Sequence, residues 1–464
     1  MENLKVGEIV RAVGGRLLCG DPDTVISYIS IDSRDIQENT LFTPIIGERV
    51  DAHKFIGQVF EAGAKAVFTS KGEIVDETKP HIFVKDTQRA LGDLAIYYRS
   101  KYPVPVIGIT GSVGKTSTKE MIAAALAPKY RVLKTAGNQN SNIGVPLTLF
   151  RLGPEHEMAV VEMGISDFGE MDELAEFAAP ETAVVTNIGV AHIGILKSQE
   201  NIMHEKLKIA GNFKPGQALY LNGNDPLLKS AAVQYPENAR LFGHEEDGCM
   251  DGLDYYAKDI YICDGMQHFT YVWPQGQIHV VIRQLGMHNV NNAVVAMAIA
   301  MEYGLDAKTA AEGLLAYEGI PMRQQINHLR DGIKVIDDTY NASPDSIKSG
   351  VTVLGLLDNP GRKIAVLADV LELGDMSWQC HYDTGCFVAE SGVDEVVTVG
   401  QEMKALVQAV NEHAPQIVTH NFSENDQAAG YLKGIIKPGD ALLVKGSRGM
   451  HQEEIVKALK EYFG

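Results

Sequence analysis

A glycine-rich stretch that joins an apolar run to a helical pattern constrains this chain more than any other feature. Residues 108–120 read GITGSVGKTSTKE, after the apolar run at 104–107 and before the helix-forming segment MIAAALA. A tight turn between a strand and a helix lets backbone N–H groups converge on an anion at the positive end of the helix. The stretch therefore predicts a phosphate-binding loop (P-loop) that holds a nucleotide through the following residues: Gly111, Ser112, Val113, Gly114, Lys115, Thr116 and Ser117.

Two side chains of this loop carry its expected chemistry. Lys115 is expected to reach the outer phosphates of the nucleotide, and the hydroxyl of Thr116 is expected to ligate Mg²⁺. Gly108, together with the two later glycines, is expected to open the backbone to the anion. The usual pattern has a small residue where Ile109 stands, so the loop is a variant of the common form.

Composition indicates the compartment and excludes several classes of partner. The 464 residues include 60 acidic and 41 basic side chains, and the formal charge of -19 disfavours binding to nucleic acid or to anionic membranes. The five cysteines form no CxxC pair, so neither a disulfide framework nor a zinc site is indicated. The sequence shows no secretion signal and no apolar run of about 18 residues. We expect a cytoplasmic, monomeric protein without stable membrane insertion.

The order of apolar runs and turns predicts an α/β chain of three domains. Residues 1–103 mix short strands with helices and are expected to form a small substrate domain. Residues 104–318 start at the P-loop strand and alternate strands with helices, which is typical of a parallel sheet covered by helices. Residues 319–464 repeat the alternation and predict a doubly wound, Rossmann-like domain with its own ligand crevice at the strand ends.

Polar side chains at two strand ends of the central region are candidate metal ligands. Glu162 ends the apolar strand AVVEMG, and His192 follows the next strand, TAVVTNI. Strand ends of an open sheet point into a ligand crevice, so both side chains could ligate a metal. The competing interpretations are a capping carboxylate and a packed histidine. Lys206, in the helical stretch NIMHEKLKIA, is expected from its local sequence to be solvated.

Asparagines form two further clusters, each with an ordinary alternative. Asn138 and Asn140 lie in GNQNSNIGVP and could present amides to a polar ligand or simply form turns. Asn289 and Asn292 lie on the first turns of a predicted helix and could read a purine edge or cap that helix.

The third region places polar groups after two of its predicted strands. These groups suit a carboxylate or a phosphate, although solvated loop charge would explain them equally well. They are Asp338, Tyr340, Asn341, Lys445, Ser447 and Arg448.

The order of these motifs resembles the Mur ligase family of bacterial cell-wall synthesis. TGSVGKTS, AVVEMG, NIGVAH, EKLKI, HNVNNA and DDTYNASP occur in the family's order and span nearly the whole chain. Within the family, DSRDIQENTLFTPIIGERVDAHKFI, ADVLELGDMSWQCH and LVKGSRGM are similar to segments of the member that adds a dipeptide. The resemblance implies a uridine-nucleotide domain, a central ATP-binding domain and a C-terminal ligase domain.

The resemblance also implies an activity. It is that of an ATP-dependent ligase that uses Mg²⁺ and forms an amide bond through an acyl phosphate in peptidoglycan precursor synthesis. The implied substrates are a UDP-linked muramoyl tripeptide and D-alanyl-D-alanine. Two alternatives stay open: a related ligase for another acid, such as a folylpolyglutamate synthase or another cell-wall step, and a nucleotide-binding paralogue of weak activity.

Individual residues of the central region receive roles from the same resemblance. Lys115 is implied to clamp phosphate, Thr116 and Glu162 to ligate a first Mg²⁺, and His192 to ligate a second. Lys206 matches a lysine that family members carbamylate, which turns a cation into a carboxylate-like metal ligand.

Other residues are implied to contact the nucleotide or the substrate. The implied ATP contacts are Asn289, Asn292, Arg323 and Asp338. The implied substrate contacts are Ser33, Arg34, Asn138, Asn140, Tyr340, Asn341, Lys445, Ser447 and Arg448.

Departures from the family pattern cluster after His192. Gly194 and Lys197 replace the common residues of that segment, and Lys208 stands where an acidic residue commonly follows Lys206. An added cation close to the proposed ligands is expected to weaken metal binding.

Overall fold

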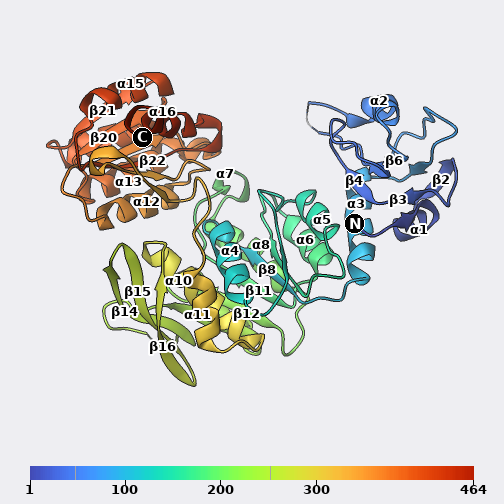
Figure 1. Cartoon of the computed structure of the whole chain (residues 1–464), viewed down its shortest axis with the longest axis horizontal. Coiled ribbons are helices and arrows are strands. Elements are labelled where there is room, and N and C mark those ends of the chain that lie inside the picture. Colours follow the sequence, from blue (N-terminus) through green and yellow to red (C-terminus); the bar gives the residue numbers. More distant parts are fainter. Residues whose placement is uncertain (48, 251) are drawn as a thin grey trace. The chain divides into compact units, whose positions relative to one another are not determined.

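The computed structural model describes residues 1–47, 49–250 and 252–464, and it is an α/β protein (Figure 1). The chain separates into two compact units, each assembled from several segments. Unit 1 consists of residues 1–109, 130–183 and 208–217. Unit 2 consists of residues 110–129, 184–207 and 218–464. Among the described residues, no helix combines the length and the apolar character that crossing a bilayer requires.

The first hundred residues of unit 1 form a five-stranded sheet with helices. The strand order is β2-β7-β6-β5-β4, parallel except for the antiparallel β2–β7 pair, and a separate antiparallel pair joins β1 to β3. The elements are β1 (Leu4–Lys5), α1 (Val6–Ala12), β2 (Arg16–Cys19), β3 (Val25–Ile26), β4 (Tyr28–Ser30), β5 (Thr40–Phe42), η1 (Ala52–Phe55), α2 (Ile56–Glu61), β6 (Ala66–Thr69), β7 (His81–Phe83) and α3 (Thr87–Ser100).

Helix α3 attaches this sheet to the rest of unit 1. Asp86 caps its start by accepting hydrogen bonds from the backbone N–H groups of residues 88 and 89. Arg89 then forms a two-pronged ion pair with Glu176 on α6 (Glu170–Ala178), at 2.9 Å for each bond. A Cβ at Gly92 would lie 2.3 Å from the ring of Phe177, so only glycine permits this close packing.

The remainder of unit 1 contains three adjacent parallel strands in the order β9-β10-β8. Strand β10 is buried along its whole length, which explains its continuous apolar sequence. The elements are β8 (Val106–Thr110), β9 (Val132–Lys134), α5 (Gly144–Leu149), β10 (Met158–Glu162), α6, and η2 (Lys208–Ala210), while β11 (Thr182–Val185) crosses into unit 2.

Unit 2 begins with the P-loop helix and continues into a second group of strands. Strands β12, β13 and β14 are parallel, whereas β14, β15 and β16 form an antiparallel meander that the parallel pattern of the sequence did not predict. The elements are α4 (Lys115–Leu126), α7 (Ile193–Leu196), α8 (Gln199–Leu207), β12 (Ala218–Asn222), α9 (Pro226–Ala231), β13 (Ala239–His244), β14 (Tyr255–Cys263), β15 (Met266–Trp273), β16 (Gly276–Ile282), α10 (Met287–Glu302) and α11 (Ala307–Leu315).

The C-terminal part of unit 2 is the predicted doubly wound sheet. Its order is β17-β18-β22-β19-β20-β21, parallel except for the edge strand β17. Two apolar cores cover its faces, one under α12, α13 and α14 and the other under α15 and α16. The elements are β17 (Gln325–His328), β18 (Lys334–Asp337), α12 (Pro344–Leu356), β19 (Lys363–Ala368), α13 (Ser377–Glu390), β20 (Glu395–Val399), α14 (Met403–His413), β21 (Val418–Phe422), α15 (Asn425–Ile435), β22 (Ala441–Lys445) and α16 (Glu453–Phe463).

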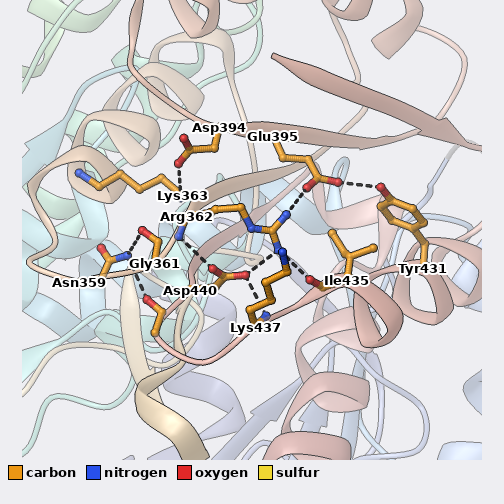
Figure 2. Close-up of polar contacts among 11 residues, drawn as sticks. Asn359, Gly361, Arg362, Lys363, Asp394, Glu395, Tyr431, Ile435, Lys437 and Asp440 are labelled. Carbon is orange, nitrogen blue, oxygen red and sulfur yellow. Dashed lines mark hydrogen bonds and ion pairs between the residues drawn. The ribbon is translucent and has the colours of Figure 1, made fainter. Parts of the chain in front are cut away.

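A charge network of two buried carboxylates and a partly exposed arginine ties together the amino ends of three of these strands. Figure 2 shows Arg362 between Glu395 and Asp440, with its guanidinium 2.8 Å and 2.7 Å from the two carboxylates. It also donates to the carbonyl of Ile435, and Tyr431 donates to the second oxygen of Glu395. Because ligand crevices lie at the carboxyl ends of parallel strands, this network serves the stability of the sheet.

Candidate functional site

The P-loop takes the conformation that its glycines predict. Gly111 has a φ of +145°, and a Cβ there would lie 1.9 Å from the Oγ1 of Thr186. Gly114 has a φ of +86° and forms the N-cap of α4. Both backbone conformations strongly favour glycine, so these two residues shape the loop at the start of the helix.

The expectation for Gly108 is wrong, because this residue lies inside strand β8 and not in the loop. A Cβ at this position would approach side-chain atoms of Met163, Pro180 and Ile209 at 3.0–3.2 Å. The absence of a side chain at Gly108 therefore serves packing beneath the strand.

A polar pair at the end of β11 holds the loop. The side-chain amide oxygen of Asn187 accepts from the N–H of Val113 at 2.8 Å, and its carbonyl accepts from the N–H of Ser112. Thr186 donates to the carbonyl of Val113, and the Ser112 hydroxyl accepts from the N–H of Gly189 at 2.9 Å. Thr186 and Asn187 were not among the residues predicted from the sequence, although their polar character directly after an apolar strand was a usable signal.

Two lysines converge on one carbonyl of the P-loop. The ammonium of Lys115 lies 2.8 Å from the carbonyl oxygen of Gly111, and that of Lys206, on α8, lies 3.2 Å from the same atom. Lys206 is buried, so the expectation of a solvated side chain is wrong. Burial, and secondly the charge of Lys115, hold the pKa of Lys206 well below its usual value. A lowered pKa increases the share of the neutral, nucleophilic amine.

The first turn of α4 is fixed from α10. Thr116 and Ser117 lie on that turn, and the hydroxyl of Thr118, one residue further, donates to the side-chain oxygen of Asn292 at 2.8 Å. Asn292 in turn donates to Asn289 at 3.4 Å, and both asparagines are buried. These two residues therefore lie within a hydrogen-bond network that positions the P-loop helix.

Glu162 occupies the expected place in unit 1, as the last residue of β10. Its carboxylate is buried and accepts a hydrogen bond of 2.8 Å from the amide of Asn140. Its backbone N–H donates to the hydroxyl of Thr135 at 2.9 Å. Asn138 lies exposed in the same loop, and its carbonyl accepts from the N–H of Asn140 at 2.8 Å. The asparagine-rich loop thus orients a buried carboxylate.

His192 forms the N-cap of the short helix α7 with a φ of +61°. Its Nδ1 lies 3.6 Å from a carboxylate oxygen of Glu372. Of the departures after His192, Lys197 is exposed and donates to the carbonyl of Gly194 at 2.6 Å. Lys208 in unit 1 forms an ion pair of 2.8 Å with Asp172. Both lysines are thus engaged by partners in their own unit.

Among the described residues, no three side chains of histidine, cysteine, aspartate or glutamate converge as a ready metal-binding group. The candidate metal ligands predicted from the sequence also include donors outside these four residue types. The hydroxyl of Thr116 is one, and a carbamate on Lys206 would be another.

The C-terminal candidates lie together at the carboxyl ends of β18 and β22. Lys445 and Asp338 form a buried ion pair of 2.7 Å, and Lys445 also donates to the carbonyl of Asn341 at 3.1 Å. The side-chain oxygen of Asn341 accepts from the N–H of Arg448 at 3.2 Å. Ser447 accepts from the N–H of Leu371 at 3.0 Å. We call this group, with the stack described next, the C-terminal cluster.

A stack of cations on one aromatic ring completes the C-terminal cluster. The guanidinium of Arg323 lies 4.1 Å from the centre of the Tyr340 ring, and that of Arg448 lies 5.9 Å from it. Burial lowers the pKa of Lys445, and the neighbouring charge of Arg323 contributes in the same direction, while Asp338 opposes it. Arg448 also pairs with Glu453 at 3.1 Å, so the cluster combines three basic side chains with two carboxylates. Its cationic N–H groups suit an anionic ligand.

In the first hundred residues, Ser33 and Arg34 lie in the loop after β4. Arg34 is exposed and pairs with Asp32, whose pKa its guanidinium lowers to about 2. The nearby His53, which the sequence reading did not select, is buried between Asp51, at 2.7 Å, and Ser70. Its position within DAH, between two polar partners, could not be foreseen from spacing.

Comparison with known proteins places these features in a family. Three family models match in sequence order: "Mur ligase family, catalytic domain" at residues 25–99, "Mur ligase middle domain" at 109–300, and "Mur ligase, glutamate ligase domain" at 322–448. The UDP-N-acetylmuramoyl-tripeptide–D-alanyl-D-alanine ligase of Bacillus subtilis is 37% identical over 94% of both chains. The Escherichia coli protein of the same name is 34% identical over 95% of both.

Solved structures give the same match at the level of the fold. MurF from Acinetobacter baumannii superposes with a TM-score of 0.91 at 32% identity over 99% of both chains. MurF ligase from Thermotoga maritima, crystallised in complex with ADP, superposes with a TM-score of 0.83 at 26% identity, over 94% of this chain and 97% of that one.

Proposed function

The chain belongs to the Mur ligase family, and we propose that it is an ATP-dependent ligase that joins D-alanyl-D-alanine to UDP-N-acetylmuramoyl-tripeptide. Relatives of more than 30% identity over nearly the whole chain carry that activity in their names. The match to a MurF structure that holds ADP supports the use of ATP. The reaction creates a carbon–nitrogen bond in peptidoglycan synthesis.

The observation that carries the proposal is the pair of lysines on the carbonyl of Gly111. A P-loop lysine that lies on its own loop is placed to exchange that hydrogen bond for a phosphate oxygen of ATP. In the proposed reaction the terminal carboxylate of the tripeptide attacks the γ-phosphoryl group, which yields ADP and an acyl phosphate. The amine of the dipeptide then attacks the acyl carbon, loses a proton and displaces phosphate. Lys115 reduces the repulsion between the two anions in the first step.

Lys206 is proposed to be carbamylated. Its neutral amine can add to carbon dioxide, with formation of an N–C bond and release of one proton, and the product is an anionic carbamate. Burial and the neighbouring Lys115 support the proposal, because both favour the neutral amine that performs this addition. The carbamate would carry a negative charge, which attracts the ammonium of Lys115.

The donors in this chain fit Mg²⁺, which prefers oxygen ligands. On the strength of the family pattern we propose Thr116 and the buried carboxylate of Glu162, each by itself, as a ligand of Mg²⁺, and a carbamate on Lys206 would offer a further oxygen. When bound, Mg²⁺ supplies positive charge to the phosphate oxygens. His192 is proposed as the ligand of a second ion on the strength of the family pattern alone, since an imidazole suits Mg²⁺ less well.

The remaining site residues are proposed to divide between nucleotide and substrate. Arg323 and Asp338 are proposed to contact phosphate and ribose, and the rest of the C-terminal cluster to contact the acidic substrate, which its positive charge supports. Asn289 and Asn292 are proposed to support the nucleotide side. Ser33, Arg34, Asn138 and Asn140 are proposed to bind the UDP-linked peptide.

We also propose the division into domains at 1–103, 104–318 and 319–464. The family models support it, since one ends at residue 99, the next covers 109–300 and the third begins at 322. A monomer that works in the cytoplasm, where nucleotide-linked precursors and ATP are available, is the remaining part of the proposal.

Phosphate release from ATP tests the proposed activity. We expect release only when the UDP-linked tripeptide and D-alanyl-D-alanine are both present, and no release with a folate substrate and glutamate. Lys115→Ala should abolish release, whereas Lys308→Ala, at an exposed lysine of α11, should leave it unchanged. Turnover without a uridine nucleotide would favour a ligase for another acid, and ATP binding without turnover would favour a weakly active paralogue.

Chemical rescue tests the carbamate separately. Lys206→Ala should lose most of the activity and regain part of it when a short carboxylate such as formate is added. A folded Lys206→Ala variant that no short carboxylate activates would count against carbamylation and leave the ligase assignment intact.

A further inference from the structure

The β14–β16 meander carries an imidazole cluster that the ligase reaction does not use. Helices α10 and α11 pack against one face of this meander. The other face presents His268 on β15 and His279 on β16 (strands labelled in Figure 1). The ring of Tyr261 on β14 stacks on both imidazoles, and its centroid lies 5.0 Å from that of His268 and 6.3 Å from that of His279. Tyr261 is 52% exposed and His279 is exposed, so solvent reaches the cluster.

The strand register fixes the two histidines as diagonal neighbours. His268 pairs directly with Val281, and Thr270, two residues along the same strand, pairs with His279. Residues that alternate by two share one face of a strand, so both imidazoles project from the same face of adjacent strands. Their relative position is therefore set by the backbone ladder and does not depend on a flexible loop.

The distance between the two facing ring nitrogens matches the separation of two ligands on one metal ion. Nδ1 of His268 lies 3.1 Å from Nε2 of His279. Imidazole nitrogens bind Zn²⁺ at about 2.0–2.1 Å, which places two such ligands roughly 2.9 Å apart at a right angle and roughly 3.3 Å apart at a tetrahedral angle. The observed separation falls between these values.

The hydrogen-bond pattern of the pair is compatible with such a ligand. One proton lies between the two facing nitrogens, and it must move to the other nitrogen of its own ring before both lone pairs face a cation. Where the proton is on Nε2 of His279, the exposed ring can make this change through solvent. Within the described residues, Nε2 of His268 is buried and has no hydrogen-bond partner, so the pair does not belong to a closed structural network.

We propose that His268 and His279 form a bidentate surface site for a late first-row divalent cation, with Zn²⁺ as the leading candidate. Imidazole suits Zn²⁺ and Ni²⁺, whereas Mg²⁺ prefers oxygen ligands, so the site is chemically separate from the one proposed for the ligase reaction. No third histidine, cysteine, aspartate or glutamate joins the pair among the described residues, so water completes the coordination.

Calorimetric titration with Zn²⁺ tests the site in the untagged full chain, with saturating Mg²⁺ and ADP present throughout. We expect one Zn²⁺ per chain at this site, and about a tenfold or larger loss of affinity in His268→Gln and in His279→Gln. His328→Gln, at an exposed histidine of β17, is the matched control and should bind as the original chain does. Zinc-edge anomalous diffraction should place the ion about 2.0–2.1 Å from both nitrogens.

Unchanged zinc affinity in the double variant His268→Gln/His279→Gln would overturn the proposal. Loss of binding in Cys263→Ser, at the exposed cysteine that ends β14, with retention in the histidine variants would overturn it too. The histidine variants should release phosphate from ATP at the original rate, so a failed zinc site and a failed ligase assignment are distinguishable.

Discussion

Replacing Asp338 with asparagine should expose the energetic cost of the buried cation in the C-terminal cluster. Lys445 and Asp338 are 2% and 6% exposed, and their charged atoms lie 2.7 Å apart. The substitution removes the negative charge and keeps a side chain of nearly equal volume. Lys445 keeps one acceptor, the carbonyl of Asn341 at 3.1 Å, which cannot balance a full charge.

The magnitude follows from this geometry. At an effective dielectric constant of 20, two unit charges 2.7 Å apart attract by about 6 kcal/mol, and burial of each ion costs several kcal/mol in return. The intact pair is therefore close to neutral in its effect on stability, whereas removal of one partner costs about 3–5 kcal/mol. We expect Asp338→Asn to lower the free energy of unfolding by about 3 kcal/mol, since the amide still accepts a hydrogen bond. Lys445→Met in the same chain should recover about 2 kcal/mol of this loss.

Urea unfolding of the C-terminal part provides the assay. Trp273 and Trp378 are the two tryptophans of the chain, so a Trp273→Phe background leaves Trp378 on α13 as the fluorescent reporter. Asp338→Asn/Lys445→Met should regain stability but not phosphate release, because Asp338 is proposed to contact the nucleotide. An Asp338→Asn variant as stable as its parent would refute the reasoning, and so would a double variant less stable than the single one.

Three further outcomes follow from individual contacts. Gly111→Ala should weaken ATP binding at least tenfold, because it sets a Cβ 1.9 Å from the Oγ1 of Thr186 in a strained backbone. Calorimetric titration with ATP measures this loss, and Thr186→Ala in the same chain should restore part of the affinity. Burial lowers the pKa of His288, so protonation favours the unfolded chain, and the free energy of unfolding should fall as the pH drops below about 6.5. In urea unfolding curves recorded over a pH series, His288→Gln should reduce this fall. Asp440→Ala should lower the free energy of unfolding by about 1.5–3 kcal/mol in the Trp378 assay, because it removes one of the two carboxylates that pair with Arg362 while Glu395 remains. A loss under about 1 kcal/mol would contradict the role assigned to the network in Figure 2.

Local sequence patterns predicted several backbone features of the candidate site. Glycines predicted a tight turn between a strand and a helix, and the positive φ values at Gly111 and Gly114 confirm that turn. The position of Glu162 at the end of an apolar strand predicted its place at the end of β10. Such features depend on neighbours within a few residues, so the sequence around them carries the information.

Several features were decided only by contacts between distant parts of the chain. Gly108 could not be told from a loop glycine until the packing of β8 was known, and Lys206 looked solvated because its helical stretch gives no sign of what covers it. Its lowered pKa arises from burial and from Lys115, which is 91 residues away along the chain (206 − 115). The diagonal pairing of His268 with His279 likewise depends on strand register, which two short apolar runs do not encode by themselves. Local sequence determines backbone conformation and chemical type, whereas burial and proximity to other charges are properties of the assembled fold, and these two set the reactivity of a lysine or a histidine.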